Sequence, residues 1–354
     1  MVVRVSRLLL AAGVVVGAAA QSVAWRDAMR QPGAWYGGAE ARRIADNLLA
    51  YQKDVGGWDK NIDMSVAIAA EKRDPSGYAT IDNSATYTQM RFLARVYTAT
   101  HDARYASSFR KGLQYLLKMQ YANGGWPQFY PLRDGYWSHI TYNDDAMVGV
   151  MELLRDIAAR RAEFAFLNDE ERANSRRAVD KGIECMLKTQ VTQNGKLTVW
   201  CAQHDETTLA PAKARAYELP SLSGSESVGV VEFLMAIEKP APAVVRAIEA
   251  AVEWFRASKI KGIRVVRKPA PETPRGTDAV VVEDPAAPPL WARFYELGTN
   301  RPIFCGRDSM VKYSLAEIEY ERRNGYRWYV DSPSRLLDRE YPEWKARLAG
   351  EKTR

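Results

Sequence analysis

The clearest pattern in the sequence is an apolar stripe that recurs four times along the chain. In each copy, apolar residues occupy positions i, i+4, i+7 and i+8, and the first three copies end with glutamine at i+11. This spacing places the side chains on one face of a helix, so each copy predicts an amphipathic α-helix. The copies begin at Ala41, Phe109, Val179 and Ala247, a period of about 70 residues that indicates an internal structural repeat.

A second family of helices is expected between these copies. It covers residues 83–99, 145–160, 226–238 and 309–323, and a polar cluster precedes each segment. The second and third segments carry glycine and valine at close intervals, which is typical of helices packed on all sides. The first family is more charged, as expected for an outer ring. Alternating helix pairs predict an all-α fold, an α/α toroid of inner and outer helices.

Two long connections interrupt this regularity. Residues 197–222 contain one short β-like piece, at 197–200, and residues 260–303 contain two, at 263–266 and 279–282. Loops of this length in a compact domain are usually functional. We expect a single toroid domain over residues 25–345 and a charged C-terminal tail over residues 346–354.

The first 24 residues read as a signal peptide, with two arginines, a short apolar run and small residues near a cleavage site. The run is too short to span a membrane, so we expect a protein exported to the periplasm or the medium. The net charge of +7 is compatible with a polyanionic substrate. The absence of a clustered basic run argues against nucleic acid. The spacing of the three cysteines fits neither a disulfide framework nor a zinc site, and buried thiols are expected.

Charged residues cluster where the inner helices begin. In a toroid the loops at one end of these helices converge, so four distant segments should meet: Asp82-Asn83, Asp144-Asp145, residues 203–218 and residues 293–308. The first two segments supply acids and the last two supply cations. Oxygen ligands beside arginines suit calcium and a carboxylated ligand, and the aromatic-rich stretch 123–147 suits a sugar-binding cleft. The alternative is a set of separate helix caps and surface ion pairs.

Six ordered blocks of sequence resemble the pectate lyases of polysaccharide lyase family 10. The similarity runs from about residue 35 to residue 330. The blocks are GGWDKNIDM (56–64), TIDNSAT (80–86), GGWPQFYP (124–131), TYNDDAM (141–147), APAKARAYELPSLSGSES (210–227) and RFYELGTNRPIFCGRDS (293–309). Two residues depart from the pattern: Asp59 stands where proline is expected, and Cys305 where a small hydroxyl residue is expected.

The resemblance implies an (α/α)3 toroid that cleaves polygalacturonate by calcium-dependent anti β-elimination, giving 4,5-unsaturated products, and we expect a monomer. It assigns the catalytic base to Arg215. It implies calcium ligands and substrate-binding residues at these positions: Asp82, Asn83 and Asp144 for the metal, and Lys213, Arg293, Arg307 and Thr141 for the substrate.

An arginine base needs a neutral guanidine, and we expect crowding by Lys213, calcium and other arginines to favour that form. Two other readings stay open. One is a glycoside hydrolase that pairs Asp144 with Asp205 or Glu218 as acid and carboxylate. The other is a sugar-binding module without activity, in which the aromatics form platforms and the acids form helix caps.

Overall fold

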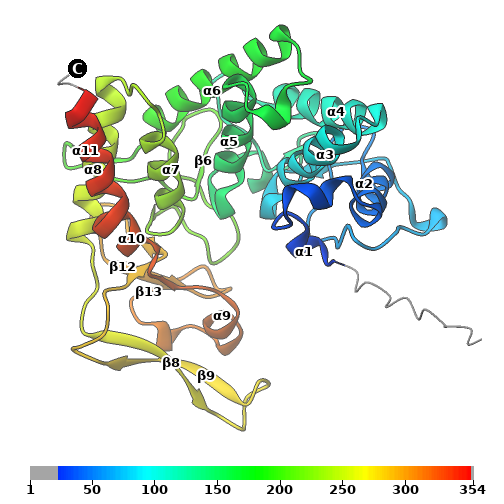
Figure 1. Ribbon diagram of the computed structural model, residues 1–354. Coiled ribbons are helices and arrows are strands. Elements are labelled where there is room, and N and C mark those ends of the chain that lie inside the picture. Colours follow the sequence, from blue (N-terminus) through cyan, green and yellow to red (C-terminus); the bar gives the residue numbers. More distant parts are fainter. Residues whose placement is uncertain (1–22, 352–354) are drawn as a thin grey trace, which may run out of the picture.

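A computed structural model describes residues 23–351 of the chain. The predicted signal peptide, residues 1–24, lies outside the described residues except for its last two. Helices of the two predicted families alternate along the chain (Figure 1). The outer helices are α2 (Ala39–Tyr51), α4 (Ala103–Met119), α6 (Asp169–Thr189) and α8 (Pro242–Ala257). The inner helices are α3 (Tyr87–Thr100), α5 (Ala146–Ala158) and α7 (Glu226–Met235).

The helices pack as three antiparallel pairs, α3 with α4, α5 with α6 and α7 with α8. Neighbouring pairs meet through both layers: α3 contacts α5 and α5 contacts α7 in the inner layer, while α4 contacts α6 and α6 contacts α8 in the outer layer. The arrangement confirms the predicted (α/α)3 toroid. A short helix, α1 (Trp25–Ala28), and a 3-10 turn over Gly33–Gly37 precede α2.

The predicted repeat has a physical basis in a tryptophan that follows each outer helix. Each indole N–H donates to a carbonyl in the last turn of that helix, at 2.7–2.9 Å. The pairs are Trp58 with Leu48, Trp126 with Leu116, Trp200 with Met186, and Trp291 with Phe255. All four tryptophans are buried. A polar anchor at the same place in each repeat fixes the chain as it leaves the outer layer.

The glutamine at i+11 links each outer helix to the next one. Its amide donates to a carbonyl of its own turn and to a carbonyl on the following outer helix: Gln52 to Gly56 and Ser108, Gln120 to Gly124 and Ala178, Gln190 to Thr198 and Ala247. The turn glycines allow this close approach. Gly124 has φ +94°, and a Cβ there would lie 2.0 Å from the Lys181 carbonyl oxygen.

The fourth predicted inner helix, residues 309–323, is wrong. This segment forms strand β13 (Val311–Lys312), a 3-10 turn over Leu315–Glu317 and the short helix α9 (Tyr320–Gly325). Its apolar residues, Leu315 and Ile318, belong to a second, smaller core that also contains Phe304 and Trp328. The segment therefore folds against neighbouring strands instead of continuing the ring.

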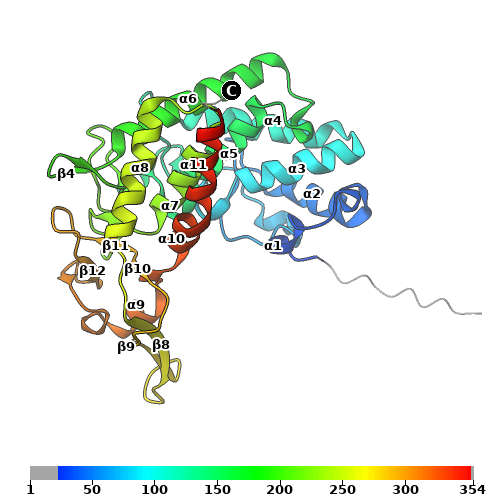
Figure 2. The ribbon, with the colours of Figure 1, turned by 60° about the vertical axis from the view of Figure 1, so that its left-hand side comes forward.

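The C-terminal helices pack beside α7 and α8 (Figure 2). They are α10 (Ser332–Arg335), a π-helical turn over Leu336–Glu340, and α11 (Tyr341–Glu351). Arg335 pairs with Glu232 of α7 at 2.7 Å, and Lys345 pairs with Glu249 of α8 at 2.7 Å. Residues 346–351 of the predicted tail thus continue the last helix. Among residues 23–351, none of the helices is both long and apolar enough to cross a bilayer.

Short antiparallel strands connect the helices and form a β-rich region at one end of α7 and α8 (Figure 1). The paired strands are β1 (Ala79–Thr80) with β2 (Phe129–Tyr130), β3 (Ile140–Thr141) with β6 (Gln203–His204), β4 (Thr192–Gln193) with β5 (Lys196–Leu197), β8 (Ile263–Pro269) with β9 (Thr277–Glu283), and β10 (Trp291–Ala292) with β14 (Tyr329–Val330). A four-stranded sheet has the order β13-β12-β11-β7, with β12 (Pro302–Cys305), β11 (Phe294–Tyr295) and β7 (Leu222–Ser223). The predicted strands at 263–266 and 279–282 are confirmed as β8 and β9.

Candidate active site

Two loops that lead into inner helices share one unusual backbone shape. Asn83 has φ 50° and ψ 42°, and Asp144 has φ 50° and ψ 36°. A second left-handed residue follows each of them, Ser84 at φ 63° and Asp145 at φ 56°. Asparagine and aspartate tolerate this region better than other side chains, and such strain concentrates at functional sites. The matching turns make Asp82 equivalent to Asn143 and Asn83 equivalent to Asp144.

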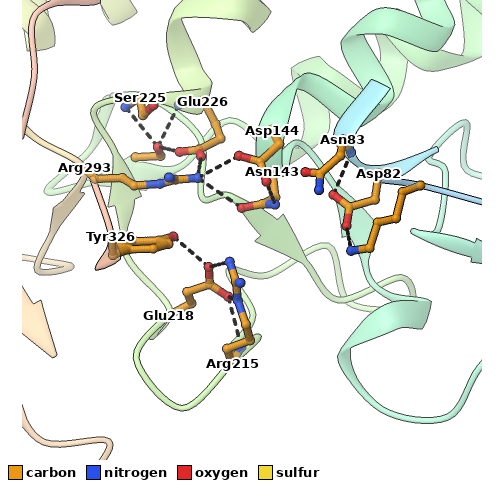
Figure 3. Close-up of polar contacts among 12 residues, drawn as sticks. Asp82, Asn83, Asn143, Asp144, Arg215, Glu218, Ser225, Glu226, Arg293 and Tyr326 are labelled. Atoms are coloured by element: carbon orange, nitrogen blue, oxygen red, sulfur yellow. Dashed lines mark hydrogen bonds and ion pairs between the residues drawn. The ribbon is translucent and has the colours of Figure 1, made fainter. Parts of the chain in front are cut away.

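The two loops contact each other and bring their oxygen atoms into one space (Figure 3). Asp82 is buried and pairs with Lys60, while the Asn83 amide donates to Asn61 at 2.9 Å. Asp144 is partly open to solvent, with 39% of its side chain exposed. The predicted metal residues therefore do come together, at the N-terminal ends of α3 and α5.

Arg293 enters this space from β11 and the adjoining segment. Its Nη2 donates to Asp144 at 3.2 Å and to Asn143 at 3.3 Å, and it forms an ion pair with Glu226 at the start of α7. Both Arg293 and Glu226 are buried, and the Ser223 hydroxyl also donates to Glu226. The predicted substrate-binding Arg293 thus bridges two inner helices and leaves little of its guanidinium exposed.

Arg215 lies in the loop that connects β6 to β7, below Asp144 in Figure 3. Its Nε donates to Glu218 at 2.7 Å, and the Tyr326 hydroxyl donates to the same carboxylate at 2.7 Å. The guanidinium also lies over the rings of Tyr217 and Tyr326, at 5.0 and 5.6 Å. The partners of Glu218 hold that carboxylate in place, and Glu218 in turn orients Arg215.

In the protein without metal, cations do not lower the pKa of Arg215 below its usual value as expected. Burial lowers the pKa of the guanidinium, but the Glu218 hydrogen bond and charge outweigh burial, and the pKa is raised above its usual value. Lys213 instead donates to the Ser309 hydroxyl at 3.0 Å. Arg322 lies on the same Tyr217 ring as Arg215, at 4.5 Å, but Glu218 outweighs this like charge.

The other predicted substrate-binding residues differ in accessibility. Thr141 is fully buried in β3 and its hydroxyl has no hydrogen-bond partner in the described chain, so direct substrate contact by this side chain is wrong. Arg307 is exposed and pairs with Glu321 at 3.1 Å. Because Ser309 also donates to the Ala216 carbonyl at 2.9 Å, the loop with Arg307 lies against the loop with Arg215.

Several site residues were not predicted as partners. They are Lys60, Asn143, Glu226 and Tyr326, together with the anchoring role of Glu218. Asn143 could have been found by aligning TIDNS with TYNDD, since the two loops have equivalent positions. Glu226 pairs with Arg293 and Glu218 accepts from Tyr326 through contacts between distant segments, which no local pattern reports.

Asp145 follows Asp144 directly and its carboxylate faces Gly229 of α7. Burial, followed by the charges of Glu226, Glu232 and Asp144, raises the pKa of Asp145 to about 7. A Cβ at position 229 of α7 would lie 2.4 Å from its carboxylate oxygen, so Gly229 provides the room for this side chain. This shift favours the protonated form of Asp145, next to an Asp144 whose side chain is 39% exposed.

The histidines and cysteines have structural surroundings. Burial lowers the pKa of His204 to about 4, and its ring bonds to the Leu209 carbonyl at 2.9 Å and accepts from the Cys201 N–H at 3.1 Å. His139 pairs with Glu206 at 2.8 Å, and Asp205 lies close to both. All three cysteines are free and buried, as predicted. Asp59 pairs with Lys53 at 3.2 Å.

Comparison with known proteins identifies the family. The family model for pectic acid lyase matches residues 52–337, which is most of the chain. The chain belongs to the pectic acid lyase family. Members of this family are polysaccharide lyases, so the protein is a lyase of the pectate lyase type.

Two solved structures are similar to this pectic acid lyase. One is a family 10 polysaccharide lyase from Cellvibrio cellulosa, with 38% sequence identity and a TM-score of 0.76 over 86% of this chain and 92% of that one. The other is a point mutant of the family 10 lyase from that organism in complex with trigalacturonic acid, with the same identity and TM-score over 86% and 93% of the two chains. A comparison with curated protein sequences gave no match.

Proposed function

We propose that this pectic acid lyase cleaves α-1,4-linked polygalacturonate by anti β-elimination, with calcium as its metal. The observation that carries the proposal is one cluster of charges: the oxygen atoms of two left-handed loops face Arg293 and the Arg215–Glu218 pair (Figure 3). Such a cluster suits a metal-bridged uronate carboxylate on one side and a proton acceptor on the other. The trigalacturonic acid bound by the similar lyase supports the substrate class.

The donor set fits a hard cation. Asp82, Asn83 and Asp144 offer carboxylate and amide oxygens, the ligands that calcium prefers. Asp144 is exposed enough to be reached, and its bond to Arg293 leaves other lone pairs available. Bound calcium would neutralise the uronate carboxylate and make the adjacent C5 proton more acidic.

Arg215 is proposed as the group that accepts the C5 proton. Glu218 and the two tyrosine rings fix the direction of its guanidinium, so the side chain is pre-organised for proton transfer. A protonated guanidinium cannot accept a proton, and Glu218 favours that form. Activity should therefore rise with pH, because the reactive neutral form becomes more populated.

The positions of the remaining cations support a binding role. Lys213 and Arg307 lie on adjoining loops beside Arg215, where they can attract a polyanionic chain and pair with its carboxylates. We propose that the enzyme acts as a monomer outside the cytoplasm, where polygalacturonate occurs as a polymer.

The hydrolase alternative is less compatible with the acids. Asp205 accepts from the backbone N–H groups of Thr208 and Thr207, at 2.6 and 3.0 Å. These hydrogen bonds lower the pKa of Asp205, whereas a general acid needs a raised pKa. Glu218 is also a poor acid, because Arg215 holds its pKa below the usual value against the effect of burial.

The deciding experiment follows ultraviolet absorbance during incubation with polygalacturonate, with calcium or with a chelator. We expect an absorbance rise from the unsaturated product, lost with chelator and restored by added calcium. Reducing ends without absorbance would mean hydrolysis and would overturn the proposal. The Arg215→Lys variant should lose most turnover while keeping affinity for the polymer; nearly unchanged turnover would move the base to Lys213.

A further inference from the structure

Arg133 is held in an aromatic cradle within the loop between β2 and β3. The centre of its guanidinium lies 4.1 Å from the Trp137 ring, 5.0 Å from the Phe129 ring and 5.4 Å from the Tyr78 ring. Tyr78 is exposed and Trp137 is partly exposed. Three rings around one cation restrict the guanidinium to a narrow range of positions.

The charge of Arg133 is unpaired in the described part of the chain. The structure gives its guanidinium neither a hydrogen bond nor an ion pair, and the neighbouring Asp134 carboxylate forms no ion pair with it. Most other arginines around the site, including Arg215, Arg293 and Arg307, pair with an acid. Arg133 therefore keeps its N–H donors available for an external acceptor.

The cradle adjoins the proposed metal site. Phe129, one wall of the cradle, lies 5.9 Å from the Lys60 ammonium, which pairs with Asp82. Trp137, another wall, packs against Tyr136 in a tilted arrangement, with 4.6 Å between ring centroids. Tyr136 lies within electrostatic reach of the reaction centre: burial raises its pKa, and the Arg215 charge lowers it.

We propose that Arg133 and its cradle form a binding subsite for the carboxylate of a galacturonate unit outside the reaction centre. A rigid, planar guanidinium with free donors matches a carboxylate bidentately. Because the rings already fix the arginine, little side-chain entropy is lost when the carboxylate binds. This inference rests on the proposed function for the class of ligand, a chain of uronates.

The test measures polymer binding in the presence of chelator, by retardation in native gels that contain either polygalacturonate or highly methyl-esterified pectin. Arg133→Ala is compared with Arg256→Ala, since Arg256 also lies on one ring, that of Tyr341 at 5.3 Å, but on the outer helix α8. We expect Arg133→Ala to weaken binding to polygalacturonate about fivefold to tenfold and to leave binding to the esterified polymer unchanged. Arg256→Ala should change neither.

A second variant tests whether weaker binding by Arg133→Ala comes only from lost packing of the loop. Arg133→Lys keeps the charge without the planar fork, and we expect it to bind polygalacturonate about threefold to fivefold more weakly than wild type. An equal loss on both polymers would assign Arg133 a packing role, and no loss on polygalacturonate would also overturn the subsite. If the wild type binds polygalacturonate through Arg133 but yields no unsaturated product, the proposed function fails and the subsite stands.

Discussion

The buried pair of Arg293 and Glu226 gives the sharpest test of how the site is built. Their side chains are 9% and 3% exposed, and Ser223 is the other side-chain donor to Glu226. In Arg293→Met the carboxylate would stay buried without its cation. Removing one partner of a buried pair costs about 3–5 kcal/mol, because the remaining charge is uncompensated. We therefore expect a loss of about 3–5 kcal/mol in the free energy of unfolding.

Urea unfolding followed by circular dichroism measures this loss. Adding Glu226→Gln to Arg293→Met removes the orphaned charge, so the double variant should be more stable than Arg293→Met alone, by about 1–2 kcal/mol. Arg335→Met is the matched control. Its partner Glu232 is also on α7, but the pair is 58% and 32% exposed, so the loss should stay below about 1 kcal/mol.

Two results would refute this reasoning. A loss below about 1 kcal/mol for Arg293→Met would mean that water or another group compensates Glu226. A double variant no more stable than the single one would mean that the cost is packing rather than charge. The pair also separates stability from the substrate-binding role predicted for Arg293: Glu226→Gln can restore folding, but a raised KM would persist if the guanidinium binds uronate.

Three further predictions concern charge, protonation and backbone. Glu218→Gln removes the carboxylate that raises the Arg215 pKa. We therefore expect the rising limb of the kcat/KM–pH profile to move about one pH unit lower, a value reduced for the exposure of Arg215. A limb that does not move would argue against Arg215 as the base. Burial lowers the pKa of His204 from 6.5 to about 4, so the stability that depends on its neutral form is present above pH 6.5 and is lost as pH falls toward 4. Over this range the free energy of unfolding of wild type should fall by about 3 kcal/mol more than that of His204→Gln, as measured by urea unfolding at both pH values. Gly124→Ala should lower the free energy of unfolding by about 2–3 kcal/mol, because its Cβ would meet the Lys181 carbonyl at positive φ. Gly195→Ala, at φ +76° with open space around it, should lower it by about 1 kcal/mol. Equal melting temperatures for the two variants would contradict this account.

The sequence predicted the helical layers because each outer helix buries a single face. The stripe that starts at Phe109 and ends at Gln120 is the buried side of α4, and the glutamine is the polar link to the next helix. Such a local, periodic pattern can be recognised in the sequence without knowing which element packs against the helix. The 309–323 segment lacked this support: it was expected as a helix from its place in the alternation and the polar cluster before it. Its apolar residues Leu315 and Ile318 pack instead in a separate core made with strands from elsewhere in the chain.

The sequence pointed to the candidate ligand residues, which the structure brings together, but not to the residues that hold them in place. Asp82 and Asp144 stand out in the sequence because short polar clusters precede apolar runs. Glu226 and Glu218 look like ordinary helix and loop acids, and their burial against Arg293 and Arg215 appears only in the folded chain. The surroundings of Arg215 were misjudged because the prediction weighed Lys213 and other cations, and Glu218, only three residues away, was not recognised as its partner.

The three loops that precede the inner helices occupy equivalent places in the repeat but differ in backbone conformation and in the position of their acids. In the first two loops, left-handed residues turn Asn83 and Asp144 toward a shared space. The third loop passes through Gly224 without a left-handed residue, and its acid comes two residues later, as Glu226 at the start of α7. That acid binds Arg293, which donates to Asp144 in the second loop. The first two loops therefore supply the oxygen atoms proposed as metal ligands, and the third supplies the carboxylate that positions Arg293 against them.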